Sequence, residues 1–329
     1  MKSVPQHFRL SGSARHLPST SISAADLDGR LGLEPGWTFR HTGIHTRYQA
    51  TGAETGATMA KTVVEAAVSD AGCTIADIDL IVDASLSVQQ PIPCNAALIQ
   101  QSLGPAASGI PCIDVHASCL GFLAALQVVN GLFAGRTFRR AVIVCSETPL
   151  NGVNWQEPDS ACLMGDGAAA VVVEAVEPSG NCVFKLETFA QDAELCHVKG
   201  GGHRLPAYLF TDDQSSKFRF HMDGKALHRA ASRYLPPMIG GVLEMAGCEL
   251  GDLHIIPHQA SVPSIEFLAR RLRVDRSRLH SSVAEHGNLV AAGIPFVLHE
   301  VRRRQSTGER VMLVGTAAGY TQGCVIFTL

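Results

Sequence analysis

The segment VVEAAVSDAGCTIADIDLIV at residues 63–82 returns 175 residues later as MIGGVLEMAGCELGDLHIIP at residues 238–257. AGC, an acidic residue and the apolar positions stay in step between the two copies. At a similar offset, RRAVIVCSE at 139–147 matches ERVMLVGTA at 309–317. Two matches at similar offsets predict a chain built from two similar halves. A chance likeness between two amphipathic helices is the alternative.

Strand-like and helix-like patterns alternate along the chain. Short apolar runs rich in β-branched residues predict buried strands, and longer runs with helical spacing predict helices. We expect strands at 78–85, 109–115, 140–147 and 167–176, and helices at 59–71 and 120–133. Such alternation predicts an α/β fold. We divide the chain into an N-terminal half, residues 1–177, and a C-terminal half, residues 178–329, joined at a turn-rich stretch.

Composition excludes several classes of protein. Of the 329 residues, 46% are apolar and 17% charged, which predicts a folded globular chain rather than a disordered one. The net charge of -3 gives no overall basic field that would attract nucleic acid or a membrane surface. It does not exclude a local basic patch. The N-terminus lacks the apolar core of a signal peptide, and no apolar run is long enough to span a membrane. We therefore expect a cytoplasmic protein.

Ten cysteines are scattered along the chain without a C-x-x-C pair, and most lie inside apolar runs. This pattern is typical of reduced core cysteines. Cys196 and His197 with His203 have loop-like spacing and no fourth ligand, so we expect no metal site.

One cysteine differs from the rest. Cys119 lies in DVHASCLGFLAAL, residues 114–126, where a predicted strand ends and an apolar helix begins. The positive end of a helix favours a thiolate, so Cys119 is a candidate nucleophile. Alternatively, Cys119 is a structural residue whose small side chain fills a strand-to-helix turn.

Two polar residues of the C-terminal half are further candidates. His258 follows the apolar run LHIIP, at the end of a predicted strand where α/β proteins tend to bind ligands. Asn288 lies in EHGNLVAAGIP, where it could equally cap a helix. A lone histidine is also a common structural residue. Under the duplication, equivalent turns of the two halves meet, which predicts that Cys119, His258 and Asn288 share one pocket.

Five segments carry a resemblance to a known family: DVHASCLGF, IIPHQAS, HGNLVAAGIP, GDGAAAVVV and GWTFRHTGIHTR. In this order they resemble the signature segments of β-ketoacyl-ACP synthase III and its relatives among the thiolase-fold condensing enzymes. The likeness runs from about residue 20 to the C-terminus. It implies a five-layered αβαβα fold of two duplicated halves, and a homodimer.

The resemblance also implies a reaction. Cys119 takes an acyl group from an acyl-CoA thioester, and His258 with Asn288 stabilises the enolate formed when malonyl-ACP loses carbon dioxide. A Claisen condensation then extends the acyl chain. The oxyanion hole is implied to be the backbone N–H groups of Cys119 and Gly319. The family uses acyl carrier protein as partner and no metal or redox cofactor.

Substrate contacts follow the resemblance less closely. Trp37 matches a tryptophan that stacks on adenine in the family. His41 stands where the family has an arginine, and Arg40 lies one place earlier. Pro158 stands where the family has a second arginine that stacks on adenine. Losing a planar, permanently charged group at such a site is not conservative.

The segment after His258 also departs from the family. Ser261 replaces an asparagine, and Pro263 replaces an arginine that binds the carrier protein. Arg270, Arg271 and Arg273 offer a basic surface for an acidic carrier. A solvated helix face is the alternative for these three.

The predicted pocket wall SLSVQQPIPCNA, residues 85–96, is more polar than in the family. Gln89 and Gln90 could meet a polar or carboxylated acyl tail, as in a branch that condenses atypical acyl donors.

Two other functions stay open from the sequence. One is a non-condensing acyltransferase of the same fold, which passes the acyl group to a hydroxyl or amine. The other is a silent partner subunit, although such subunits usually lose the nucleophile or the histidine.

Overall fold

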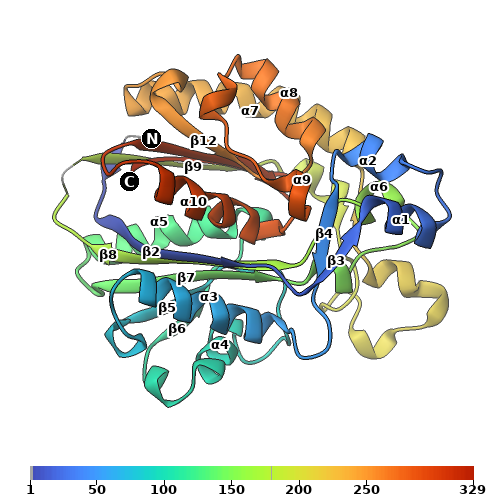
Figure 1. The fold of residues 1–329 in the computed structure, drawn as a ribbon, viewed down its shortest axis with the longest axis horizontal. Helices are drawn as coiled ribbons and strands as arrows, with labels where there is room; N and C mark the ends of the chain where they lie inside the picture. Colours follow the sequence, from blue (N-terminus) through green and yellow to red (C-terminus); the bar gives the residue numbers. More distant parts are fainter. Residues whose placement is uncertain (1–2, 179) are drawn as a thin grey trace.

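The computed structural model describes residues 3–178 and 180–329. Two five-stranded sheets alternate with three layers of helices (Figure 1), which confirms the five-layered α/β arrangement. The first sheet has the order β2 (Phe8–His16), β8 (Gly167–Ala175), β7 (Arg140–Glu147), β5 (Leu80–Asp83), β6 (Cys112–Asp114). The second has the order β1 (Val4–Pro5), β9 (Asn181–Thr188), β14 (Thr321–Thr328), β13 (Arg310–Ala317), β12 (Leu253–Pro257).

Helices cover both faces of each sheet. The outer layers are α3 (Gly56–Asp70) with α4 (Asn95–Leu103) on the first sheet and α7 (Gly224–Ala246) with α8 (Val262–Leu272) on the second. The helices α5 (Gly121–Ala134) and α10 (Gly293–Arg304) lie between the sheets. Strands packed on both faces need continuous apolar runs, which explains why seven of the eight residues of β7 are buried.

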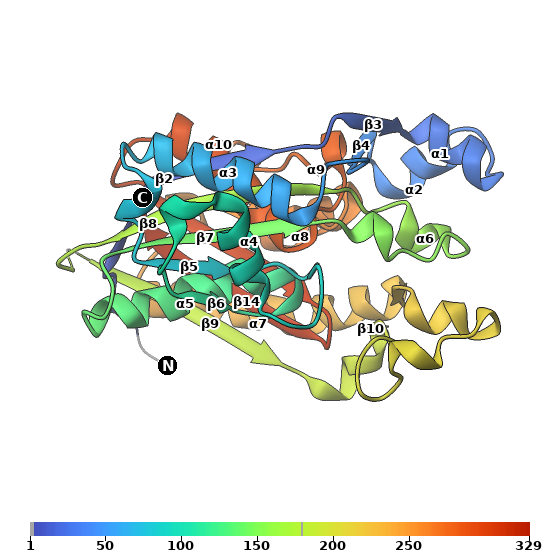
Figure 2. The same ribbon diagram turned by 90° about the horizontal axis from the view of Figure 1, so that it is seen from below.

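The smaller elements gather at one end of the molecule (Figure 2). They include α1 (Ala24–Leu31), α2 (Trp37–Thr42) and α6 (Pro158–Ala161), together with the excursion between β9 and α7 that carries β10 (Cys196–His197) and β11 (His221–Met222). β3 (Thr20–Ser23) pairs with β4 (Thr46–Gln49), and α9 (Val283–His286) precedes α10. Among the helices of residues 3–178 and 180–329, none has the length and apolar character that a membrane crossing requires.

The two halves repeat one topology. The first sheet runs β2-β8-β7-β5 and the second β9-β14-β13-β12, with β6 or β1 added at an edge. Residues 63–82 run from α3 into β5, and residues 238–257 run from α7 into β12. Each helix is followed by a three-residue turn that is capped by a carboxylate, Asp77 or Asp252. The predicted duplication is therefore confirmed in three dimensions.

A close backbone contact fixes the start of α5. A Cβ atom at Gly121 would lie 2.1 Å from the carbonyl oxygen of Ala84, at the end of β5. Only a glycine lets the helix begin so near the strand. The residues directly before Gly121 are thereby held at the carboxyl end of the first sheet.

This contact makes a stability prediction. Gly121→Ala should lower the free energy of unfolding by about 1–3 kcal/mol, because the added methyl group overpacks the interior. Gly131→Ala in the same helix, where a Cβ meets nothing within 4 Å, should instead raise it by up to about 1 kcal/mol through helix propensity. Urea unfolding of both variants measures the difference. Equal shifts would show that the contact at Ala84 carries no constraint.

Candidate active site

Cys119 lies at the entrance of α5, in a short 3-10 turn of residues Ser118–Leu120. Ser118 has φ of +49°, a left-handed conformation that a serine rarely adopts, so the surrounding fold must hold this turn. The predicted position of Cys119 at a helix start is confirmed. The backbone N–H groups of Cys119 and Ala318 face its sulfur.

The protonation of Cys119 differs from the prediction. Burial raises the pKa of the thiol well above its usual range, and the two backbone N–H groups lower it by less. Cys119 as a residue is half-buried and lines a cavity. The helix start alone therefore does not make a resting thiolate, and Cys119 needs a proton acceptor when it reacts.

His258 follows β12 and is 8% exposed. Its backbone N–H donates to the carbonyl of Val314 over 2.7 Å. A Cβ atom at Gly315 would lie 2.5 Å from the His258 Cβ, so a glycine in β13 makes room for the ring. Burial lowers the pKa of His258 to about 4, so the imidazole is neutral at neutral pH. Its Nδ1 is buried and has no hydrogen-bond partner among the described residues.

Asn288 is held on the loop before α10. Its backbone N–H donates to Leu163 over 2.8 Å, and its Oδ1 accepts from the N–H of Val290 over 2.9 Å. Because the oxygen is occupied, the Nδ2 amide is the group left to donate to a ligand. Ala292 is the N-cap of α10, so the alternative that Asn288 caps this helix is wrong.

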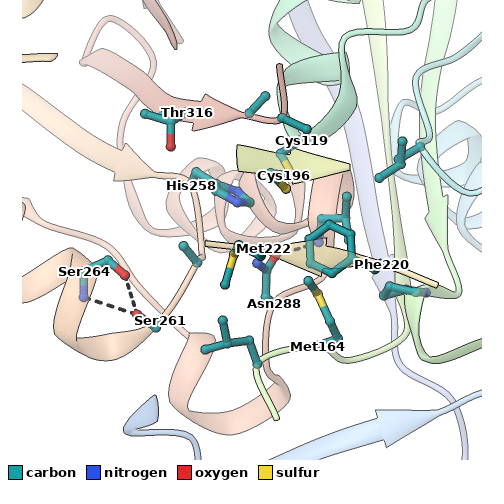
Figure 3. A pocket seen from close by; sticks show the side chains of 18 of the residues that line it. Cys119, Met164, Cys196, Phe220, Met222, His258, Ser261, Ser264, Asn288 and Thr316 are labelled. Carbon is teal, nitrogen blue, oxygen red and sulfur yellow. Dashed lines mark hydrogen bonds between the residues drawn. The ribbon is translucent and has the colours of Figure 1, made fainter. Parts of the chain in front are cut away.

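The three side chains point into one cavity of about 1530 Å³ (Figure 3). Cys119 comes from the N-terminal half and the other two from the C-terminal half, so the site lies where the halves meet, as the duplication predicted. The wall near them is largely apolar and includes Met164, Cys196, Phe220 and Met222. A thiol, a neutral imidazole and a carboxamide therefore share a largely apolar environment.

The second backbone donor is one residue away from its predicted position. The N–H that faces the sulfur belongs to Ala318, which also lines the cavity. Gly319 is not among the lining residues, and its φ of +91° belongs to the turn into β14. The prediction of Gly319 is corrected to Ala318, because the chain turns away from the cavity at the glycine.

The predicted substrate contacts are only partly brought together. Gln89 and Ser261 line the cavity, and Ser261 also caps α8. Gln90 lies outside the lining and donates through Nε2 to the carbonyl of Ile92 over 2.6 Å. The prediction for Gln90 is therefore wrong, because its amide serves the local turn.

Trp37 and Arg40 also lie outside the cavity lining. The ring of Trp37 stacks on His41 with 4.0 Å between ring centroids, and it is His41 that reaches the cavity. Arg40 donates to the carbonyl of Pro35 over 2.9 Å. The predicted contacts of Trp37 and Arg40 are corrected for this structure, since both side chains are engaged within the α2 region.

The three predicted carrier-binding arginines have different surroundings. Arg271 lines the cavity, whereas Arg270 lies 3.6 Å from Glu266 on the exposed face of α8. Arg273 has φ of +55° and ends that helix. Two further cations, Lys225 and Arg229 at the start of α7, also line the cavity. No pattern in the sequence singled out Lys225 or Arg229.

A buried carboxylate was missed from the sequence. Glu147 ends β7 and accepts the backbone N–H groups of Leu86 over 2.7 Å and Ser87 over 2.9 Å. Burial raises the pKa of Glu147 to about 7. Both Leu86 and Ser87 line the cavity, so Glu147 holds part of its wall in place. An acidic residue at the end of an apolar strand was the available signal.

Comparison with known proteins agrees with this site. Residues 113–191 match the family model described as 3-oxoacyl-[acyl-carrier-protein (ACP)] synthase III, and residues 243–329 match the model of its C-terminal part. The chain is 31% identical over 324 residues to beta-ketoacyl-[acyl-carrier-protein] synthase III of Neisseria gonorrhoeae, covering 98% of this chain and 99% of the relative. It is 32% identical to the enzyme of the same name from Rhodobacter capsulatus, and the match covers 96% of this chain and 97% of that relative.

Solved structures extend the likeness to the whole fold. The 3-oxoacyl-[acyl-carrier-protein] synthase III of Aquifex aeolicus superposes with a TM-score of 0.88 at 27% identity, covering 98% of this chain and all of that one. The enzyme of that name from Pseudomonas aeruginosa gives a TM-score of 0.86 at 27% identity, with 98% of each chain covered. The duplicated fold, the cysteine at the helix entrance and this similarity over nearly the full length together establish that the chain belongs to the 3-oxoacyl-[acyl-carrier-protein] synthase III family.

Proposed function

We propose that this protein transfers an acyl group from a thioester to Cys119 and then condenses it with malonyl-ACP, with loss of carbon dioxide. One observation carries the proposal: a single cavity holds a thiol faced by two backbone N–H groups, a neutral imidazole and an unoccupied amide donor. These are the groups that a covalent acyl intermediate and an enolate require. The steps use no metal ion or redox cofactor.

In the acylation step, the Cys119 sulfur attacks the carbonyl carbon of the donor thioester. The thiol proton passes to the neutral His258 imidazole, and the N–H groups of Cys119 and Ala318 stabilise the negative oxygen. The carbon–sulfur bond to the donor then breaks, and the departing thiol takes the proton from His258. The products are an acyl-Cys119 thioester and a free thiol.

In the condensation step, the malonyl group loses carbon dioxide and the electrons of the broken bond form an enolate. The N–H of His258 and the Nδ2 of Asn288 hold the enolate oxygen; both donors are uncharged. The enolate carbon attacks the acyl-Cys119 carbonyl, the bond to sulfur breaks, and the released Cys119 thiolate takes up a proton from solvent. The new carbon–carbon bond leaves a 3-oxoacyl chain on the carrier.

The walls of the site support an apolar acyl group and an acidic carrier. Met164, Phe220 and Met222 surround the space beside Asn288 (Figure 3), which favours an unbranched hydrocarbon chain over a carboxylated one. Lys225, Arg229 and Arg271 line the cavity as well and suit the phosphate of a coenzyme A or phosphopantetheine donor. We also propose the homodimer that is usual in the family.

The first prediction concerns the covalent intermediate. Mixing the protein with acetyl, medium-chain and glutaryl thioesters should give one acyl adduct with the apolar donors, detected by intact-protein mass spectrometry. The adduct should vanish when malonyl-ACP is added, with release of carbon dioxide and an extended ACP product. Cys119→Ala should form no adduct, because the other thiol of the cavity, Cys196, lacks the two facing N–H groups. Transfer to a hydroxyl or amine without carbon dioxide would contradict condensation.

The second prediction separates the two steps. Asn288→Asp should slow condensation by on the order of 10²–10³, because a carboxylate removes a donor and opposes the enolate charge. Acylation of Cys119 should change by only a few fold. Asn151→Asp is the matched control, since Asn151 lines the same cavity away from the reacting groups, and it should leave both steps near the wild-type rates. An equal loss in both steps would remove Asn288 from its proposed role.

The third prediction follows from the pKa of His258, which burial lowers from 6.5 to about 4. The imidazole stays neutral as the pH falls through 6.5, and becomes protonated only near pH 4. The rate of acylation should therefore show no loss centred at pH 6.5 and should fall toward pH 4, where the proton acceptor is lost. Single-turnover rates across this range test the prediction, with His41→Gln at the cavity rim as a control. The prediction would be contradicted if the acylation rate of the wild type fell with a midpoint near pH 6.5 and His41→Gln showed the same midpoint.

A further inference from the structure

A second cysteine lines the catalytic cavity. Cys196 lies in the two-residue strand β10 and is paired with Met222 of β11; it is 9% exposed. Of the ten cysteines, all within the described residues, only Cys119 and Cys196 are among the lining residues. The proposed reaction uses one thiol and assigns no role to the other.

The two thiols are neighbours across the cavity. Figure 3 shows the sulfur-bearing side chains of Cys119 and Cys196 together beside His258. After burial, the charge of a Cys196 thiolate is the largest cause that raises the pKa of Cys119, ahead of the Glu147 carboxylate. This effect agrees with the proximity of the two side chains in Figure 3. Both thiols are reduced in this structure.

We propose that Cys119 and Cys196 form a reversible disulfide when the protein meets a hydroperoxide, which withdraws the nucleophile and protects it from irreversible oxidation. The proposal rests on the cavity geometry and holds whichever acyl transfer the site performs. It makes Cys196 a resolving cysteine placed inside the active site.

The chemistry balances in two steps. The Cys119 sulfur attacks one oxygen of hydrogen peroxide, the O–O bond breaks, and Cys119 sulfenic acid and one water form. The Cys196 sulfur then attacks the sulfenic sulfur, and the hydroxyl leaves with the Cys196 proton as a second water. Two thiols are oxidised and one peroxide is reduced. Cys119 reacts first because the neutral His258 imidazole beside it can take its proton as the sulfur attacks.

The position of the short strand outside the two large sheets supports bridging. A disulfide needs Cα atoms within about 4.4–6.8 Å, so one segment must be able to adjust. β10 belongs to the excursion between β9 and α7, outside the two large sheets, and pairs only with β11 among the described strands. The Cys119 turn is fixed by Gly121 against Ala84, so β10 is the segment that would move.

Peroxide treatment of the full-length protein tests the proposal. Wild type should lose alkylation of Cys119 by iodoacetamide and yield a Cys119–Cys196 linked peptide in a non-reducing digest. Dithiothreitol should restore alkylation to the untreated level. Peptide mapping is needed because Cys94 and Cys112 also lie near each other and could lose hydrogens in the intact mass. Alkylation and mass report on the disulfide without any condensation assay.

Two variants make the result decisive. In Cys196→Ser, Cys119 should gain two or three oxygen atoms and recovery by dithiothreitol should be lost, since no resolving thiol remains. Cys73→Ser removes a half-buried thiol outside the cavity and should behave as wild type. The proposal is overturned if the linked peptide is absent while Cys119 of wild type is irreversibly oxidised. It is also overturned if Cys196→Ser recovers as fully as wild type.

Discussion

Burial of the reacting groups between the two halves determines how this site works. Burial raises the pKa of the Cys119 thiol and lowers that of the His258 imidazole to about 4, so both groups rest in their neutral forms. In a resting ion pair of thiolate and imidazolium, the proton would already have moved before a substrate binds. In the neutral pair, the proton moves only when a substrate supplies the developing oxyanion that the backbone N–H groups stabilise.

The fold positions these groups by bringing backbone segments unusually close. Gly121 lies against Ala84, Gly315 leaves room for His258, and a Cβ at Gly165 would lie 2.1 Å from the carbonyl of His286, two residues before Asn288. Each catalytic side chain thus follows or adjoins a position where only glycine fits. The duplication explains the arrangement, because the same strand-to-helix turn of each half faces the shared cavity.

The sequence predicted features that repeat or that sit at the ends of regular elements. The offset of 175 residues gave the two-half fold, and the strand-to-helix turn gave the position of Cys119. Contacts that depend on the path of a loop could not be predicted from the sequence. Ala318 replaced Gly319 because a turn decides which N–H points inward, and Trp37 was misplaced because His41 stacks on its ring. Cys196 was considered only as a metal ligand, and rejected, because its distance from Cys119 along the chain hid their proximity.

The same burial that keeps Cys119 neutral also shapes its chemical vulnerability. A thiol with a raised pKa is a slow target for oxidants, but catalysis requires that it pass through the thiolate, which is the reactive form. Each turnover therefore exposes the sulfur to oxidation for a short time. Burial also raises the pKa of Cys196, to about 12, so this thiol too rests in its neutral form, and the proposed reaction never activates it. A cavity with two thiols can thus use Cys119 for catalysis and Cys196 to form a disulfide when Cys119 is oxidised.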